Sequence, residues 1–286
     1  MKKDVIIFLG QSNMQGQTDK LSENEPVNNA WEYRYLTDTL VALRNPVGEN
    51  ITYDYKEGQD YAECSDNWHA DMVLGASVAG KTNMVPEFAR SYCALAETSI
   101  VAVHAAKGAT VISDWIPGTP GFEAIVKKTQ GAIAKIGKGN IGKVSAVWLQ
   151  GESDALEATP KEIYAQKLVL LKKALDEIIG LSAFGIIKVG KFASEASWCS
   201  IPKDQALKYD IAIQSAQADV CKTEDGFVML TEITDKLLSD PELVNPYESA
   251  HFGARGQEIL GAIAGYNLAA YLYHKPSCKD FQLDIF

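Results

Sequence analysis

Five short apolar runs, separated by longer stretches with helical periodicity, most strongly limit how this chain of 286 residues can fold. The runs are rich in β-branched residues, as expected for strands that are covered on both faces. They cover residues 5–9, 99–104, 143–149, 184–189 and 227–230. Strands that alternate with helices predict right-handed crossovers and a parallel sheet with helices on both faces. The sequence thus predicts an α/β fold with about five strands in a flavodoxin-like order.

Four helices are predicted between and after these strands. Proline suits the first turn of a helix, and Pro86, Pro160 and Pro202 open three of the stretches. The buried stripe expected after Pro160 consists of leucines and ends at Ile178. The fourth helix covers residues 254–273, and its three glycines lower helix propensity but allow close packing on a sheet.

Residues 19–82 depart from this pattern, because they are polar, rich in Tyr, Trp, Asn and Gly, and lack a long helical period. We expect short strands and loops there, inserted after the first strand at the mouth of the sheet, where ligand contacts collect. No repeat, low-complexity tract or linker divides the chain. Residues 1–286 are therefore expected to form a single domain.

Composition narrows the class of protein. The formal charge is −10, from 27 Lys and Arg against 37 Asp and Glu, which disfavours a nucleic-acid partner. No apolar run approaches the roughly 18 to 20 residues of a membrane span, and residues 5–9 are too short for a signal peptide. Five scattered cysteines without Cys-x-x-Cys spacing indicate reduced thiols rather than disulfides or a metal site. We expect a cytoplasmic protein with no membrane partner.

A candidate nucleophile, Ser12, directly follows the first predicted strand, in the segment GQSNM at residues 10–14. The carboxyl end of a parallel strand is where ligands bind, so Ser12 is expected at the active edge of the sheet. If a helical turn begins there, the Ser12 N–H can also stabilise an oxyanion. The alternative is that Ser12 only caps a helix.

A base for this serine must be one of four histidines. His69 and His274 fall in segments expected to be solvated, and His104, at the end of the second strand, is more often packed or hydrogen-bonded. His251 lies in a loop just before the last helix, at the same predicted edge as Ser12. Glu248, three residues earlier, is placed to orient the imidazole and to stabilise its charged form.

Further polar residues follow the second and third strands. Gly108 allows close approach of the backbone and offers a second oxyanion N–H, and Gln150 offers a side-chain N–H. Glu152 and Asp154 suggest glycosidase chemistry, but adjacent acids in one loop more often organise that loop. Trp115 is interpreted either as an aromatic wall of the site or as a buried structural residue.

Four ordered motifs make the chain resemble a known family. It is similar to the sialate O-acetylesterase and acetylxylan esterase branch of the SGNH hydrolases over nearly its whole length. The resemblance implies a three-layer α/β/α sandwich and serine-dependent removal of O-acetyl groups from sugars, with no metal or organic cofactor. It rests on GQSNM at 10–14, KGAT at 107–110 with Trp115, WLQGESD at 148–154, and His251-Phe252 followed by Gly256-Gln257.

By motif position the resemblance implies Ser12 as nucleophile, His251 as base and Glu248 as the orienting acid. It implies an oxyanion hole from the Ser12 N–H, the Gly108 N–H and a side chain of the third motif, for which we take Gln150. Substrate contacts are expected from Gln11, Glu152 and Trp115.

Three residues depart from the family pattern. Glu248 stands where Asp is usual, so a Ser-His dyad is an alternative to a triad. Gln150 stands where the wider superfamily has Asn. Lys107 replaces a glycine, and we expect its side chain to be solvated at the rim rather than to select an anionic substrate.

The expected partner is thus an acetylated saccharide. Two alternatives stay open: a lipid esterase or thioesterase on the same fold, and a sugar-binding protein that has lost catalysis, which the Glu248 departure suggests. Aromatic residues of the 19–82 insertion fit sugar stacking better than a lipid groove. They are Trp31, Tyr33, Tyr53, Tyr55 and Trp68.

Overall fold

A seven-stranded sheet forms the centre of the computed structural model, which describes residues 2–22, 25–48, 81–247 and 250–277. The strand order is β3-β2-β4-β1-β5-β6-β7, and every pairing is parallel except that of β2 with β3. The strands are β1 (Lys3–Gly10), β2 (Ala30–Arg34), β3 (Thr39–Ala42), β4 (Ser99–Ala106), β5 (Ile141–Leu149), β6 (Ala183–Ile187) and β7 (Phe227–Thr231).

The sequence prediction of five strands is wrong in number. All five predicted strands form, and their order β4-β1-β5-β6-β7 is the expected flavodoxin-like one. The two additional strands come from the polar region after β1: β2 pairs with β4 through Ala30 and Ile100, and β3 turns back along β2. The described part of the expected insertion therefore extends one edge of the sheet. Residues 49–80 lie outside the described residues.

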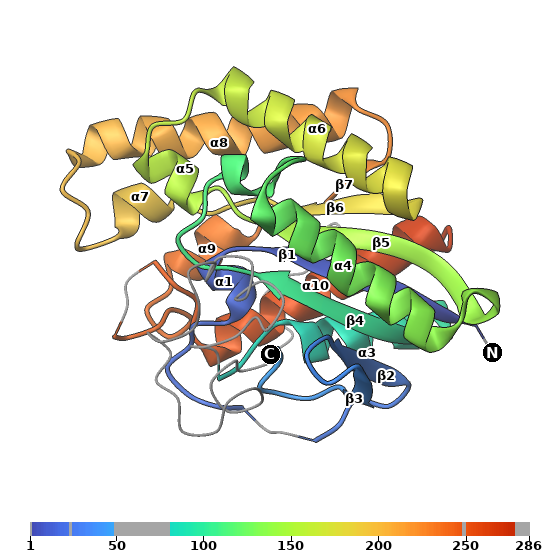
Figure 1. The fold of residues 1–286 in the computed structure, drawn as a ribbon. Coiled ribbons are helices and arrows are strands. Elements are labelled where there is room, and N and C mark those ends of the chain that lie inside the picture. Colours follow the sequence, from blue (N-terminus) through green and yellow to red (C-terminus); the bar gives the residue numbers. More distant parts are fainter. Residues whose placement is uncertain (1, 23–24, 49–80, 248–249, 278–286) are drawn as a thin grey trace.

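Helices cover both faces of the sheet, which gives the expected three layers (Figure 1). One face carries α3 (Val85–Ala96) and α10 (Ala254–Leu272), and the other carries α4 (Pro120–Ile136), α6 (Lys161–Ile179) and α8 (Lys203–Thr223). The short elements are α1 (Ser12–Gln15), α5 (Glu152–Leu156), α7 (Phe192–Glu195), α9 (Thr234–Leu238) and the 3₁₀ turns η3 (Ile112–Trp115) and η4 (Lys138–Asn140). None of the described helices is both long and apolar enough to span a bilayer.

Alternation along β1 separates the core into two halves. Val5 and Ile7 pack with the residues under α4, α6 and α8, whereas Ile6 and Phe8 pack with those under α3 and α10. All four predicted helices form. Ile178, expected in the buried stripe of α6, is 47% exposed instead, because it lies in the last turn of the helix. The helix α4 was not among the predicted ones.

The glycines of α10 serve a different contact from the expected one. A Cβ on Gly261 would collide with the carbonyl oxygen of Met84, and one on Gly265 with that of Phe88. Met84 immediately precedes α3 and Phe88 lies within it. These two glycines of α10 therefore lie against a neighbouring helix and not against the sheet. Two helix backbones approach this closely only where side chains are absent.

Replacement of Gly265 by alanine should therefore destabilise the protein. Because the new Cβ meets the α3 backbone and not a flexible side chain, we expect the free energy of unfolding to fall by about 1–3 kcal/mol. Urea denaturation measures this. Gly139→Ala is the matched control, since a Cβ there meets nothing within 4 Å. Equal stability of both variants would contradict the close α3–α10 contact.

Candidate active site

Ser12 and His251 meet at the carboxyl edge of the sheet although 239 positions separate them. The Ser12 Oγ lies 2.8 Å from Nε2 of His251, and both residues are largely buried. Ser12 begins α1 directly after β1, and His251 ends the loop that precedes α10. The sequence prediction that these two residues share one edge is confirmed by this distance.

A glycine makes the sharp turn between β1 and α1 possible. Gly10 has φ +151°, and a Cβ there would collide with the carbonyl oxygen of Leu149 on β5. The next residue, Gln11, donates its N–H to that same oxygen at 3.2 Å. Close approach of β5 to this turn therefore sets where Ser12 begins the helix.

Side chains from three other segments hold α1 in place. The helix has only one turn, so the carbonyls at its end need partners from outside. Gln257 donates to the carbonyl oxygen of Asn13 at 2.8 Å, and Asn83 and His104 donate to that of Met14 at 2.6 and 3.0 Å. The expected hydrogen-bonded role of His104 is thus confirmed. Burial lowers the pKa of His104 to about 4, so its imidazole is neutral near pH 7.

Asn13, which the sequence analysis did not single out, joins the serine turn to the other motifs. Its side-chain Nδ2 donates to Glu152 Oε1 at 3.0 Å, and its side-chain Oδ1 accepts the Phe252 N–H at 3.1 Å. The neighbouring His251 is also fixed by its ring contact with Phe192, whose centroid lies 5.2 Å away. The only signal in the sequence was the position of Asn13 next to Ser12.

Two residues that the sequence analysis considered for the catalytic centre are outside the described part of the chain. Glu248, the expected orienting acid, lies outside the described residues, as does His69. His274 is exposed after the end of α10, as predicted. The structure therefore brings together Ser12 and His251 and leaves the acid of the predicted triad untested.

Gly108 lies beside Ser12, since a Cβ on the glycine would be 3.5 Å from that of the serine. Its N–H, expected to be an oxyanion donor, is bonded here to Oε1 of Gln15 at 2.8 Å. The expectation that Lys107 is solvated is wrong: its side chain is buried and donates to the Gly108 carbonyl at 2.7 Å. Burial lowers the pKa of Lys107 to about 8.

Gln150 does not offer an N–H to the reaction centre. The residue is fully buried, and its amide nitrogen lies 2.6 Å from Asp154 Oδ2, 2.8 Å from the Thr110 carbonyl and 3.2 Å from Gln11 Oε1. An amide has only two N–H groups, and these acceptors use both. The oxyanion role expected of Gln150 therefore conflicts with the structure.

The three expected substrate contacts are also interior residues. Gln11 accepts from the Ser153 N–H and from Gln150, Glu152 accepts from Asn13, and Trp115 donates to the Thr110 hydroxyl at 3.1 Å. Each is at most 2% exposed, so a substrate finds almost no surface on them. Trp115 takes the buried structural role that the sequence left as an alternative.

Burial dominates the electrostatics of the third motif. It raises the pKa of Glu152 to about 7 and that of Asp154 to about 6. Asp154 also accepts the Ile112 N–H at 2.8 Å, so it organises the loop as expected of adjacent acids. Within the described ranges, no group of three or more His, Cys, Asp or Glu side chains is placed to hold a metal ion.

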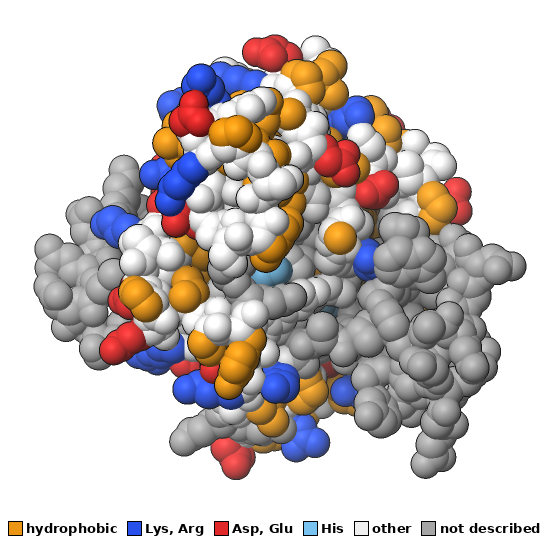
Figure 2. Space-filling view, turned by 90° about the vertical axis from the view of Figure 1, so that its left-hand side faces the viewer, with side chains coloured by type: hydrophobic (Ala, Val, Ile, Leu, Met, Phe, Trp, Pro, Cys, Tyr) orange, Lys and Arg blue, Asp and Glu red, His pale blue; other side chains and the backbone are white. Residues whose placement is uncertain are grey.

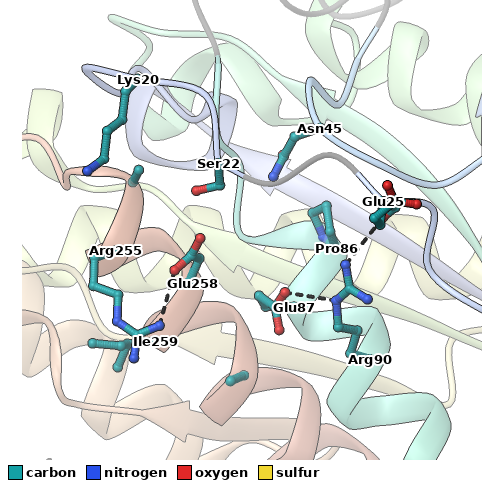
Figure 3. A pocket seen from close by; sticks show the side chains of 12 residues that line it. Lys20, Ser22, Glu25, Asn45, Pro86, Glu87, Arg90, Arg255, Glu258 and Ile259 are labelled. Carbon is teal, nitrogen blue, oxygen red and sulfur yellow. Dashed lines mark hydrogen bonds and ion pairs between the residues drawn. The ribbon is translucent and has the colours of Figure 1, made fainter. Parts of the chain in front are cut away.

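A separate cavity of about 660 Å³ lies between the N-terminal parts of α3 and α10 (Figure 3). Neither Ser12 nor His251 lines it. Its two arginines are paired within their own helices, Arg90 with Glu87 and Arg255 with Glu258. The charges around this cavity are thus balanced locally, and it is distinct from the Ser12–His251 centre.

The raised pKa of Glu152 predicts a pH-dependent stability. Between about pH 4.5 and 7 the folded protein keeps a proton that the unfolded chain has released, so this group lowers stability as pH rises through that window. Glu152→Gln removes the titration. We expect the variant to gain about 1–3 kcal/mol relative to wild type between these pH values, measured by urea denaturation. A constant difference at all pH values would contradict the buried, proton-binding carboxyl group.

The chain is similar to known proteins in sequence and in fold. A probable carbohydrate esterase of Arabidopsis thaliana is 29% identical over 189 residues, which is 65% of this chain and 67% of that protein. The solved structure of an Arabidopsis thaliana protein superposes with a TM-score of 0.62 at 18% identity, over 96% of this chain and 99% of the other.

Two further solved structures share the fold. NanS matches with a TM-score of 0.57 at 15% identity, over 96% of this chain and 97% of its own. A carbohydrate acetylesterase from Xanthomonas citri matches with a TM-score of 0.51 at 14% identity, over 95% of this chain and 56% of its own. Residues 2–262 match the family described as carbohydrate esterase, sialic acid-specific acetylesterase. The chain therefore belongs to this family of carbohydrate esterases.

Proposed function

We propose that the protein removes O-acetyl groups from carbohydrates with Ser12 as nucleophile and His251 as general base. The observation that carries this proposal is the 2.8 Å contact between Ser12 Oγ and His251 Nε2, in a chain of a carbohydrate esterase family. A serine hydroxyl becomes nucleophilic when a neighbouring base accepts its proton. The imidazole of His251 lies at the distance that this transfer requires.

The Ser12 N–H is the primary oxyanion donor in this proposal. It is the first N–H of α1, and among the described residues it has no hydrogen-bond acceptor. The Gly108 N–H becomes the second donor when the oxyanion replaces Gln15 Oε1 as its acceptor. Gln15 thus keeps the donor oriented in the free enzyme.

The reaction proceeds in two steps with the same groups. Ser12 Oγ bonds to the acetyl carbonyl carbon while its proton passes to His251, and the C–O bond to the sugar then breaks as His251 protonates the leaving oxygen. Water attacks the acetyl-enzyme, gives its proton to His251, and releases acetate as Ser12 regains a proton. Glu248 is proposed to orient His251 in both steps.

Replacement of Ser12 tests the nucleophile. Ser12→Ala should reduce acetate release from an aryl acetate and from acetylated xylo-oligosaccharides by several orders of magnitude, on the order of 10⁶ in serine hydrolases. Ser239→Ala, an exposed serine at the end of α9, is the matched control and should leave the rate unchanged. Near wild-type release by the Ser12 variant would refute the proposal. An inactive wild type would instead favour a sugar-binding protein, and a preference for long acyl chains would favour a lipid esterase.

The rate should also depend on pH through His251. The base acts only when its imidazole is neutral, so we expect kcat/KM to fall on acidification as the ring takes up a proton. Measurement on an aryl acetate between pH 5 and 8, the range in which histidines usually titrate, shows this directly. A flat profile over that range would argue against His251 as the base.

A further inference from the structure

Few aromatic side chains are exposed in the described part of the chain. Of the described residues, three aromatic side chains are largely exposed: Trp198 is 57% exposed, Tyr247 is 84% exposed and Tyr271 is 46% exposed. Trp198 follows α7, and Tyr247 lies in the loop that leads to His251, whereas Tyr271 lies near the other end of α10. The sequence analysis placed the aromatic surface elsewhere.

Two of the aromatic residues that were expected to stack on sugars, Trp31 and Tyr33, are among the described residues. Tyr33 is buried in β2 and bonds to Asp38, and Trp31 lies under the ammonium group of Lys3. Residues 53, 55 and 68 lie outside the described part of the chain. The expectation is therefore wrong for the two residues that the structure places.

Two successive ring contacts connect Trp198 to His251 through Phe192. Its ring centroid lies 5.9 Å from that of Phe192 at an interplanar angle of 66°, and Phe192 in turn lies 5.2 Å from the His251 ring at 89°. The indole is therefore within the reach of one or two linked sugar rings from the imidazole. Figure 2 shows one face of the molecule, on which a histidine is visible next to hydrophobic side chains.

The support under Trp198 is rigid. Phe192 is 3% exposed and lies in α7, whose Ala193 and Ser194 N–H groups both donate to the buried carboxylate of Asp210 at 2.9 Å. Because Phe192 and α7 are held in place, the exposed indole of Trp198 leaves apolar surface area available for a ligand. The axial C–H groups of a pyranose ring form a flat, weakly polar face that packs on an aromatic plane.

Two lysines beside this surface are paired with carboxylates. Lys203 pairs with Glu195 at 3.4 Å, and Lys191 pairs with Asp235 at 3.9 Å. The ammonium group of Lys107 turns back to the Gly108 carbonyl. An anionic sugar gains little from lysines arranged in this way, whereas a neutral ring loses nothing.

We propose that Trp198 is the stacking surface for the saccharide that carries the acetyl group, and that it selects neutral pyranosides. This inference rests on the proposed function, because it assigns the leaving sugar to the surface beside His251. The acetyl group lies at Ser12 while the sugar ring covers the indole of Trp198. Tyr247, which is 84% exposed, lies four residues before His251 in the chain.

A comparison of two substrates tests the proposal. Trp198→Ala should raise KM for acetylated xylo-oligosaccharides by a factor of about ten, the scale of one lost aromatic contact, with kcat little changed. Its kcat/KM on an aryl acetate, which has no sugar, should stay at the wild-type value. Trp198→Phe should restore part of the affinity. Tyr271→Ala, which removes another exposed aromatic ring near the C-terminal end of α10, should leave the kinetics on both substrates unchanged.

Binding without turnover gives an independent measurement. Titration calorimetry of xylo-oligosaccharides into the Ser12→Ala protein should show binding that becomes about tenfold weaker when Trp198→Ala is added. This comparison remains informative even if wild type releases no acetate, so failure of the proposed function and failure of the stacking surface can be told apart.

Three results would overturn the inference. An equal loss on the aryl acetate and on the oligosaccharide would show that Trp198 acts only by supporting Phe192 and His251. No loss on either substrate, or unchanged saccharide binding, would show that the indole does not contact the sugar. Faster turnover of O-acetylated sialic acid than of acetylated xylo-oligosaccharide, unaffected by Trp198→Ala, would refute the selection of neutral pyranosides.

Discussion

The contact between Ser12 and His251 depends on how a single helical turn is held. Helix α1 is too short to satisfy its own carbonyls, so Gln257, Asn83 and His104 supply donors from the other segments around it. These donors come from α10, from the segment before α3 and from β4. The position of the serine is thus fixed by three parts of the chain that are distant in sequence. The hydroxyl group is held in place because these parts are themselves packed in the core.

Most polar residues of the motifs support the reaction centre and do not face it. Gln11, Gln150, Glu152 and Asp154 are buried, and they bond to each other, to Asn13 and to the backbone around η3. Such a network is stable only when nearly all of its members find partners, because an unsatisfied buried polar group is costly. The high pKa values of Glu152 and Asp154 reflect the same burial. These four buried side chains hold the loops at the carboxyl edge of the sheet in place through their hydrogen bonds.

The surface near Ser12 and His251 is aromatic, whereas the buried network beneath these residues is polar. Aromatic rings run from His251 through Phe192 to the exposed Trp198, while the nearby lysines are paired with carboxylates. The fold therefore combines a buried polar network that supports Ser12 with an exposed indole that is linked to His251 through Phe192. A site of this kind suits an acetyl ester attached to a ring with one weakly polar face.

The sequence by itself determined the layers, the five parallel strands and their order, because buried strands and amphipathic helices have periods that can be counted along the chain. The sequence also predicted that Ser12 and His251 lie at the same edge of the sheet. Ser12 follows β1 and His251 precedes α10, and these two ends meet at that edge. Only the tertiary structure decided the two edge strands, the helix contact of Gly261 and Gly265, and the burial of Gln150 and Lys107. The apolar pattern shows where a strand ends, and so which residues lie near the carboxyl edge of the sheet. Hydrogen-bond partners from distant segments decide whether the side chain of such a residue is buried or faces the substrate. The aromatic surface at Trp198 was hidden for the same reason, because its exposure depends on the packing of α7 against α8 and leaves no pattern in the local sequence.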